Sequence, residues 1–186
     1  MDALRLSGYK NSEYTMEDLY NLPEGQRAEL IDGEMYMMAA PGMLHQRISG
    51  YLYKKIADYI DAESGDCEPF MAPFAVFLNA DDKIYLEPDI SVICDPNKLT
   101  AEGCKGAPDC IIEIASSSSR SRDYGKKLFL YRSSGVKEYW VVDHERNLIM
   151  RYNFEKEIVE DYSFSDKVRA GIYEGLEIDF SKIRIS

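Results

Sequence analysis

Two carboxylates interrupt successive apolar segments of this chain. Asp89 precedes Ile90-Ser91-Val92, and Glu113 lies inside Cys110-Ile111-Ile112-Glu113-Ile114. The interiors of β-strands disfavour Asp and Glu, and a buried carboxylate needs a hydrogen-bond donor or a cation. Two such acids in one small protein are typical of a metal site that is built on adjacent strands.

Alternation along the two predicted strands brings these acids together. Asp89 lies on the opposite face of its strand from Ile90 and Val92, and Glu113 lies on the opposite face from Ile112. Two converging carboxylates repel each other, and a hard divalent cation removes that repulsion. Carboxylate oxygens and water are ligands that suit Mg²⁺ or Mn²⁺. We therefore predict that Asp89 and Glu113 are metal ligands.

The elements that position these acids follow from capping and periodicity. Thr15 and Asp18 form a capping-box pattern that predicts a helix start. A hairpin is expected for Ala28–Ile31 against Glu34–Met38. A long amphipathic helix should run from Gly42 toward Gly65, because apolar residues recur at helical spacing, and His45 lies on its inward stripe.

The rest of the chain reads as strands around one helix. Two long strands are predicted at 68–78 and 85–94, joined by a turn at 79–82, and a third strand at 110–115. A serine-rich functional loop at 116–119 and a helix at 123–133, which ends at Gly135, follow. A fourth strand at 138–143 then leads to a terminal β-meander at 148–154 and 158–164. This pattern predicts a mixed α/β or α+β fold around one central sheet. We expect a single domain over residues 1–186, with roughly the first 13 residues as an N-terminal extension.

The charge composition of the chain limits how it can bind nucleic acid. The formal net charge is −11 and the isoelectric point about 4.7, whereas proteins that bind nucleic acid usually carry a basic surface. Such a chain can hold nucleic acid only through a local basic patch or through a metal. No segment suggests a membrane span or a signal peptide, so a cytoplasmic protein is expected.

The four cysteines do not suggest a zinc site. Cys67, Cys94, Cys104 and Cys110 include no pair at C-x-x-C spacing, and neither histidine is near them in the sequence. We expect buried or half-buried free thiols.

Several stretches resemble the Uma-two family within the PD-(D/E)XK nuclease superfamily. The similar stretches span most of residues 14 to 180, and their order and spacing are more specific than any single motif. They are Glu29-Leu30-Ile31-Asp32-Gly33-Glu34, His45-Gln46, Glu87-Pro88-Asp89-Ile90, Pro108-Asp109 through Glu113, Asp123 with Lys127, and Gly135 through Asp143.

This resemblance implies a restriction endonuclease-like mixed sheet flanked by helices, and a phosphodiesterase site in which Asp89 and Glu113 hold Mg²⁺ or Mn²⁺. Such enzymes normally carry a lysine two residues after the Glu, and this chain has Ala115 there. Lys127 matches a lysine that the family carries on the next helix and could replace it. We predict as site residues Asp89, Glu113, Lys127, His45 and Glu29.

Each of these residues also has a purely structural interpretation. Asp89 could cap a strand end, and Glu113 could form an ion pair with Lys127 or Arg120. Lys127 could instead pair with Asp123 four residues earlier on an exposed helix surface. His45 could be a satisfied core histidine, and Glu29 could belong to a solvated group of charges with its neighbours Arg27, Asp32 and Glu34.

Three functions follow from these alternatives. The first is a Mg²⁺-dependent DNA endonuclease that acts as a homodimer, because cutting both strands commonly pairs two sites by two-fold symmetry. The second is an inactive nuclease-like fold that serves as a binding or regulatory module. The third is a different metal-dependent hydrolase that uses the same carboxylates.

Overall fold

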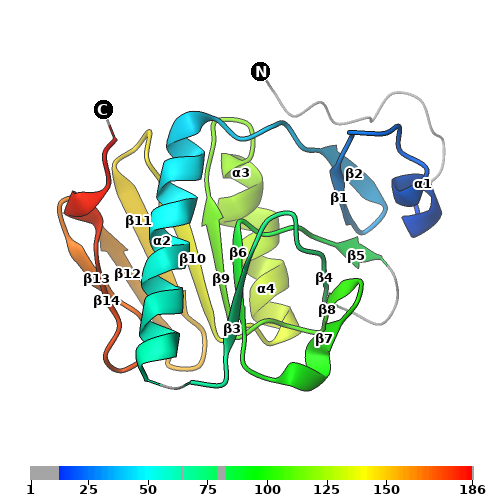
Figure 1. Ribbon diagram of the computed structural model, residues 1–186. Helices are drawn as coiled ribbons and strands as arrows, with labels where there is room; N and C mark the ends of the chain where they lie inside the picture. The colour runs from blue at the N-terminus through cyan, green and yellow to red at the C-terminus, as the bar shows by residue number, and fades with distance from the viewer. Residues whose placement is uncertain (1–12, 64, 79–82, 186) are drawn as a thin grey trace.

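A six-stranded mixed sheet forms the centre of the computed structural model, which describes residues 13–63, 65–78 and 83–185 (Figure 1). Within these residues the strand order is β12-β11-β10-β9-β6-β3. The strands are β3 (Glu68–Met71), β6 (Ile90–Ile93), β9 (Cys110–Ile114), β10 (Glu138–Asp143), β11 (Leu148–Asn153) and β12 (Ile158–Tyr162). Strands β9 and β10 run parallel, so the chain between them must cross over one face of the sheet.

Helices cover both faces of this sheet. Helix α2 (Met43–Ala62) buries Ile48, Leu52, Ile56 and Ile60 against one face. The opposite face is covered by α3 (Arg120–Arg122), a π-helical turn η2 (Asp123–Lys127) and α4 (Leu128–Ser134). No helix among the described residues is long and apolar enough to cross a membrane.

Smaller elements surround the central sheet. Helix α1 (Met16–Tyr20) packs on a sheet of β2 (Glu34–Met37), β1 (Ala28–Ile31) and β5 (Ile84–Tyr85) at one end of the molecule (Figure 1). A second small sheet and a C-terminal hairpin complete the fold, together with two short 3₁₀ turns. They comprise β4 (Val76–Phe77), β8 (Gly103–Lys105), β7 (Leu99–Thr100), β13 (Lys167–Arg169), β14 (Glu177–Asp179), η1 (Pro96–Lys98) and η3 (Phe180–Lys182).

Many local predictions are confirmed. Thr15 and Asp18 form a reciprocal capping box at the start of α1, β1 and β2 form the expected hairpin, and β10, β11 and β12 form an antiparallel meander. The helix before β10 ends at Gly135, which has a left-handed φ of 92°. Most of the proposed N-terminal extension (1–12) and the proposed turn at 79–82 lie outside the described residues.

The two long strands predicted for 68–78 and 85–94 are each divided in two. β3 ends before Pro73, and the chain then forms β4, which pairs with β8 in a separate sheet. Pro88 separates β5 from β6 in the same way. Proline cannot donate a hydrogen bond to a strand ladder, so each proline ends one pairing and lets the chain enter another sheet. As a result, Asp89 lies immediately before β6 and not in a strand interior.

The helix predicted for 123–133 begins earlier, at Arg120, and contains the π turn η2. The serine-rich loop that precedes this helix is held by an internal hydrogen bond, in which the Ser116 N–H donates to Ser119 Oγ at 3.0 Å. Periodicity alone could not reveal the π turn, since its five residues still fit a helical apolar pattern.

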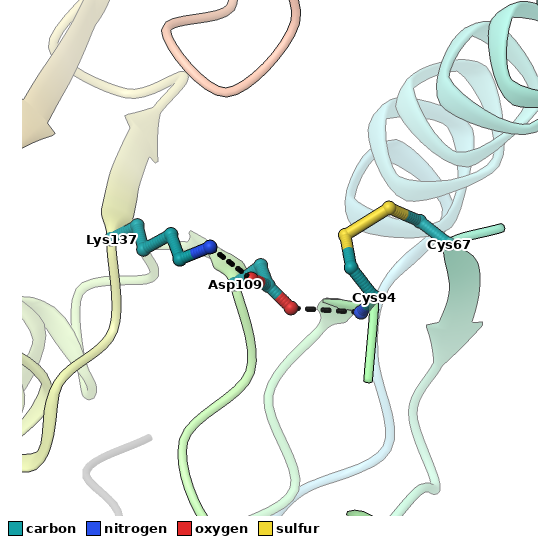
Figure 2. Close-up of a disulfide and its surroundings, with 4 residues drawn as sticks. All are labelled: Cys67, Cys94, Asp109 and Lys137. Atoms are coloured by element: carbon teal, nitrogen blue, oxygen red, sulfur yellow. Dashed lines mark hydrogen bonds and ion pairs between the residues drawn. A yellow bond between two sulfur atoms is a disulfide. The ribbon is translucent and has the colours of Figure 1, made fainter. Parts of the chain in front are cut away.

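The expectation of free thiols is wrong for two of the four cysteines. Cys67 and Cys94 form a disulfide (Figure 2). Cys104 and Cys110 are free and buried. The register of β3 and β6 pairs Glu68 with Ile93, which places Cys67 directly opposite Cys94. Asp109 lies beside this bridge, where it accepts from the Cys94 N–H at 2.8 Å and pairs with Lys137. Sequence spacing could not predict the pairing without the strand register.

Because of this disulfide, we expect the protein to have fewer free thiols before reduction than after it. Titration of the denatured protein should find two free thiols before reduction and all four cysteines after it. Cys67→Ser should lower the free energy of unfolding by about 3.5 kcal/mol, because it opens a loop whose ends are 27 residues apart. Four reactive thiols in the unreduced protein would contradict the pairing.

Candidate active site

Asp89 and Glu113 line one cleft of about 750 Å³ at the end of the central sheet. The pairing of β6 with β9 places Ile90 opposite Ile112, so the next step along the same register places Asp89 opposite Glu113. Ile90 and Ile112 belong to the core under α2, whereas Ile111 and Ala115 belong to the core on the α4 side. The predicted alternation is therefore confirmed for Glu113, which shares the face of Ile111 and Ala115. Asp89 lies just before β6 and lines the same cleft from the end of the strand.

The ammonium of Lys127 is at the centre of the acidic residues. Its Nζ lies 2.8 Å from Glu29 Oε1, 2.8 Å from Glu113 Oε1 and 3.9 Å from Asp123 Oδ1. Lys127 is only 3% exposed. The Tyr131 hydroxyl also donates to Glu113 Oε1, at 2.7 Å. The prediction that Lys127 approaches Glu113 and does not point to solvent is confirmed.

Glu29 reaches the cleft from strand β1 and is 1% exposed. One of its carboxylate oxygens accepts from Lys127 and, at 3.3 Å, from the Glu87 N–H. Glu87 in turn pairs with Arg27 and accepts from the Tyr85 hydroxyl at 2.7 Å. The interpretation of Glu29 as part of a solvated group of charges is therefore wrong.

His45 lies in the first turn of α2, beside Asp89. Its Nε2 is 3.1 Å from Asp89 Oδ1, and Asp89 Oδ2 accepts from the Ile114 N–H at 2.7 Å. Asp89 thus does hold the end of β9, as the capping interpretation requires, but it does so inside the cleft. The imidazole and the backbone amide together determine where the Asp89 carboxylate points.

The ion-pair partners in the structure decide between the other structural interpretations of Glu113 and Lys127. Arg120 does not pair with Glu113, because its guanidinium binds Asp143 and Glu145, each at 2.6 Å. Lys127 and Asp123 do lie four residues apart, but both are buried, so they are not a helix-surface pair. The position of the usual strand lysine, Ala115, is fully buried in the apolar core.

Burial and neighbouring charges raise the pKa values of two acids and of the lysine. Burial raises the pKa of Glu113 to about 8, with Asp123, Glu29 and Asp89 adding to the rise and Lys127 opposing it. Burial also raises the pKa of Asp123. For Lys127, burial favours the neutral amine, but Glu113, Glu29 and Asp123 outweigh it and raise its pKa well above the ordinary value. Lys127 is therefore a permanent cation at neutral pH.

The composition of the cleft suits one divalent cation. Among the described residues that line it are five carboxylates, of Glu29, Glu87, Asp89, Glu113 and Asp123, and three permanent cations, of Arg27, Arg122 and Lys127. With all five carboxylates ionised, the excess of two negative charges equals the charge of Mg²⁺. Within the described residues, no group of three or more His, Cys, Asp or Glu side chains is arranged to hold a metal ion. Mg²⁺ commonly uses only one or two carboxylates, with water and substrate phosphate as its other ligands, so two acids fit it.

Sequence reasoning missed three members of this site. Arg122 and Asp123 both line the cleft, and Tyr131 holds Glu113. Tyr131 lies four residues after Lys127 on the same helical stripe, and that spacing was a usable signal. No sequence signal pointed to Arg122, because its position depends on the π turn.

A mixed sheet covered by helices on both faces, with paired acids in a cleft at its end, defines a restriction endonuclease-like fold. A crystal structure described as "a putative nuclease belonging to DUF820", from Anabaena variabilis ATCC 29413, is similar over 91% of this chain and 97% of its own, with a TM-score of 0.74 and 18% identity. The "Uncharacterized protein slr1290" of Synechocystis sp. (strain ATCC 27184 / PCC 6803 / Kazusa) is 26% identical over 147 residues, which are 77% of this chain and 76% of that protein.

The profile of the family Uma2, described as "Putative restriction endonuclease", matches residues 15–181. The chain belongs to this family, which confirms the resemblance drawn from its motifs. Membership supports a nuclease function, with nucleic acid as the class of substrate.

The raised pKa of Glu113 predicts how stability depends on pH in metal-free protein. Because the folded state keeps this proton up to about pH 8 while the unfolded chain releases it near 4.5, the stabilisation from this group is complete below about pH 4.5 and is lost as the pH rises through 8. Glu113→Gln mimics the protonated acid. In EDTA it should therefore flatten the pH profile of thermal stability and melt above the wild type at about pH 9.

Glu17→Gln is a matched control for this measurement, because Glu17 is exposed on α1. It should leave the profile unchanged. A Glu113→Gln protein that melts below the wild type at high pH would show that the ionised carboxylate stabilises the fold.

Proposed function

We propose that this protein is a Mg²⁺-dependent DNA endonuclease that hydrolyses phosphodiester bonds in the cleft beside Asp89 and Glu113. The observation that carries this proposal is the position of Lys127. Its ammonium reaches Glu113 from the helix, at 2.8 Å, in a chain that has alanine at the usual lysine position. The cleft thus brings the two carboxylates and a lysine ammonium together from different elements, which supports the proposal.

Asp89 and Glu113 are the residues that would hold Mg²⁺ or Mn²⁺. Bound there, the ion would supply Lewis-acid polarisation of the phosphate and a more acidic water. His45 and the Ile114 amide orient Asp89, and Tyr131 orients Glu113. These contacts restrict the carboxylates to one arrangement before any ligand binds, which limits the reorganisation that binding costs.

Lys127 acts in this proposal as a stabiliser of negative charge and not as a base. Its three carboxylate neighbours keep it protonated. A protonated ammonium in a buried site stabilises the charge that accumulates on a phosphate during hydrolysis. Glu29 also accepts from the ammonium, at 2.8 Å, and so acts as a positioning residue.

We further propose that two copies of this chain pair their sites to cut both DNA strands, which measurement of the oligomeric state in solution tests. A monomer at working concentration would remove this part of the proposal and leave single-strand cleavage.

The proposal predicts cleavage of duplex DNA that disappears in EDTA and returns with Mg²⁺. Asp89→Asn and Glu113→Gln should abolish this activity, because each loses a ligand charge. Lys127→Ala should lower the rate by roughly 10²-fold or more, which is the usual scale for the loss of one positioned charge-stabilising donor. Gel assays of cleavage at several metal concentrations measure all three effects.

Lys126→Ala is the matched control, because Lys126 is the adjacent lysine but pairs with Glu34 at 2.6 Å. It should change the rate much less than Lys127→Ala. Equal and small effects of both substitutions in an active protein would show that Lys127 does not have the proposed role. A wild type that neither cleaves DNA nor gains thermal stability from Mg²⁺ would favour an inactive binding module.

His45→Ala should reduce cleavage by about tenfold to a hundredfold, the usual cost of losing a group that orients a ligand. Its effect on thermal stability should be small, because the side chain lies at the mouth of the cleft and is 21% exposed. Steady-state kinetics and thermal denaturation of the same preparation separate the two effects. Lys54→Ala, on the exposed face of the same helix, should change neither, and a His45→Ala protein that only loses stability would return His45 to a structural role.

A further inference from the structure

Arg122 lines the same cleft, but none of the N–H groups of its side chain donates a hydrogen bond to any described residue. Its side chain is 13% exposed, and its Nε is buried without a partner. A guanidinium carries five N–H donors, and donors that are this far from bulk water normally have acceptors. Only Nε is fully buried, whereas the two Nη groups keep some exposure, and none of these donors has an acceptor within the described chain. They are therefore free to bind a ligand in the cleft.

The other cations near the cleft are already engaged. Arg27 donates to Glu87, and Lys127 donates to Glu29 and Glu113. Arg120, two residues before Arg122, donates to Asp143 and Glu145. Arg122 therefore differs from its neighbours in having its hydrogen-bonding capacity unused.

Two contacts hold the Arg122 guanidinium without using its donors. Its central carbon lies 4.6 Å from the centre of the Tyr36 ring, which supports one face of the planar group. Its Nε is 3.8 Å from Glu29 Oε2, too far for a hydrogen bond but close enough for attraction. Stacking and charge thus orient the group while its edge stays available.

The π turn places Arg122 beside Lys127. Residues five apart in an α-helix are rotated by roughly 140° from each other, so they do not share a face. The turn η2 closes with i→i+5 hydrogen bonds, which bring such residues into line. Both cations accordingly reach the same carboxylate, with Lys127 on Glu29 Oε1 and Arg122 near Glu29 Oε2.

We propose that Arg122 binds a phosphate group of the nucleic-acid substrate, next to the Lys127 ammonium. The planar fork of a guanidinium matches two phosphate oxygens, and its donors here are oriented and unpaired. This inference deepens the proposed nuclease function and rests on it for the identity of the ligand. The alternative is that Arg122 only balances the charge of Glu29 and Asp123.

The test is the binding of a short labelled DNA duplex, with Ca²⁺ in place of Mg²⁺, over a series of salt concentrations. Arg122→Gln should weaken binding by roughly tenfold or more and should make the slope of log K against log salt shallower by about one, since one phosphate contact is lost. Arg122→Lys should keep the slope but recover only part of the affinity, because it retains the charge and loses the fork.

Lys126→Gln is the matched control, because Lys126 lies over the same Tyr36 ring, at 5.5 Å, but pairs with Glu34. It should leave the slope unchanged. A slope and affinity equal to the wild type in Arg122→Gln would overturn the inference, since a structural counter-charge does not alter the salt dependence. If Arg122→Gln fails to fold, an Arg122→Lys protein with wild-type affinity would overturn it in the same way.

Failure of the nuclease proposal can be distinguished from failure of the Arg122 inference. A wild type that binds DNA without cleaving it, with a shallower slope in Arg122→Gln, would retain the phosphate contact and reject the hydrolysis. A wild type that neither binds nor cleaves DNA would reject both.

Discussion

The arrangement of the whole cleft depends on one buried ammonium. Lys127 lies between carboxylates from strand β1, strand β9 and its own helix. Carboxylates this close and this dry repel one another, and without the lysine they would have to take up protons or separate. The ion cluster therefore connects the small N-terminal sheet to the central sheet. Burying it is costly, so its presence is better explained by function than by stability.

The helix that carries Lys127 is adapted to this cluster. A regular α-helix would direct Arg122 and Lys127 to different faces, and only one of them could approach Glu29. The π turn between them removes that conflict, and the same helix then continues into α4 to bring Tyr131 onto Glu113. A π turn replaces good hydrogen-bond geometry with poorer geometry, and such turns are frequent at functional sites. Here the π turn coincides with Asp123 and Lys127, which line the cleft.

The sequence was most informative where one physical rule dominated. Alternation placed Asp89 and Glu113 on one face, and helical spacing directed Lys127 inward, because both depend only on backbone geometry. Burial of Glu29 could not be predicted, since it depends on how β1 docks against a segment almost a hundred residues away. The disulfide depends on the register of β3 and β6, which the sequence does not show. The division of the two long strands depends on Pro73 and Pro88, each of which ends one strand pairing. Local sequence patterns thus carry no information on how distant segments of the chain pack against each other.

The acidity of the chain and a nucleic-acid substrate are compatible because of how charge is distributed in the cleft. With five carboxylates and three permanent cations among its described lining residues, the cleft would repel a phosphate when no metal is present. A divalent cation would bring the cleft to neutrality, and burial, which raises the pKa of Glu113, favours a proton on this carboxyl when no cation is bound. Binding of the ion and of the phosphate must therefore be coupled, each raising the affinity for the other. In a protein of net charge −11, that coupling would make contact with nucleic acid depend on a bound metal, as the proposed function requires.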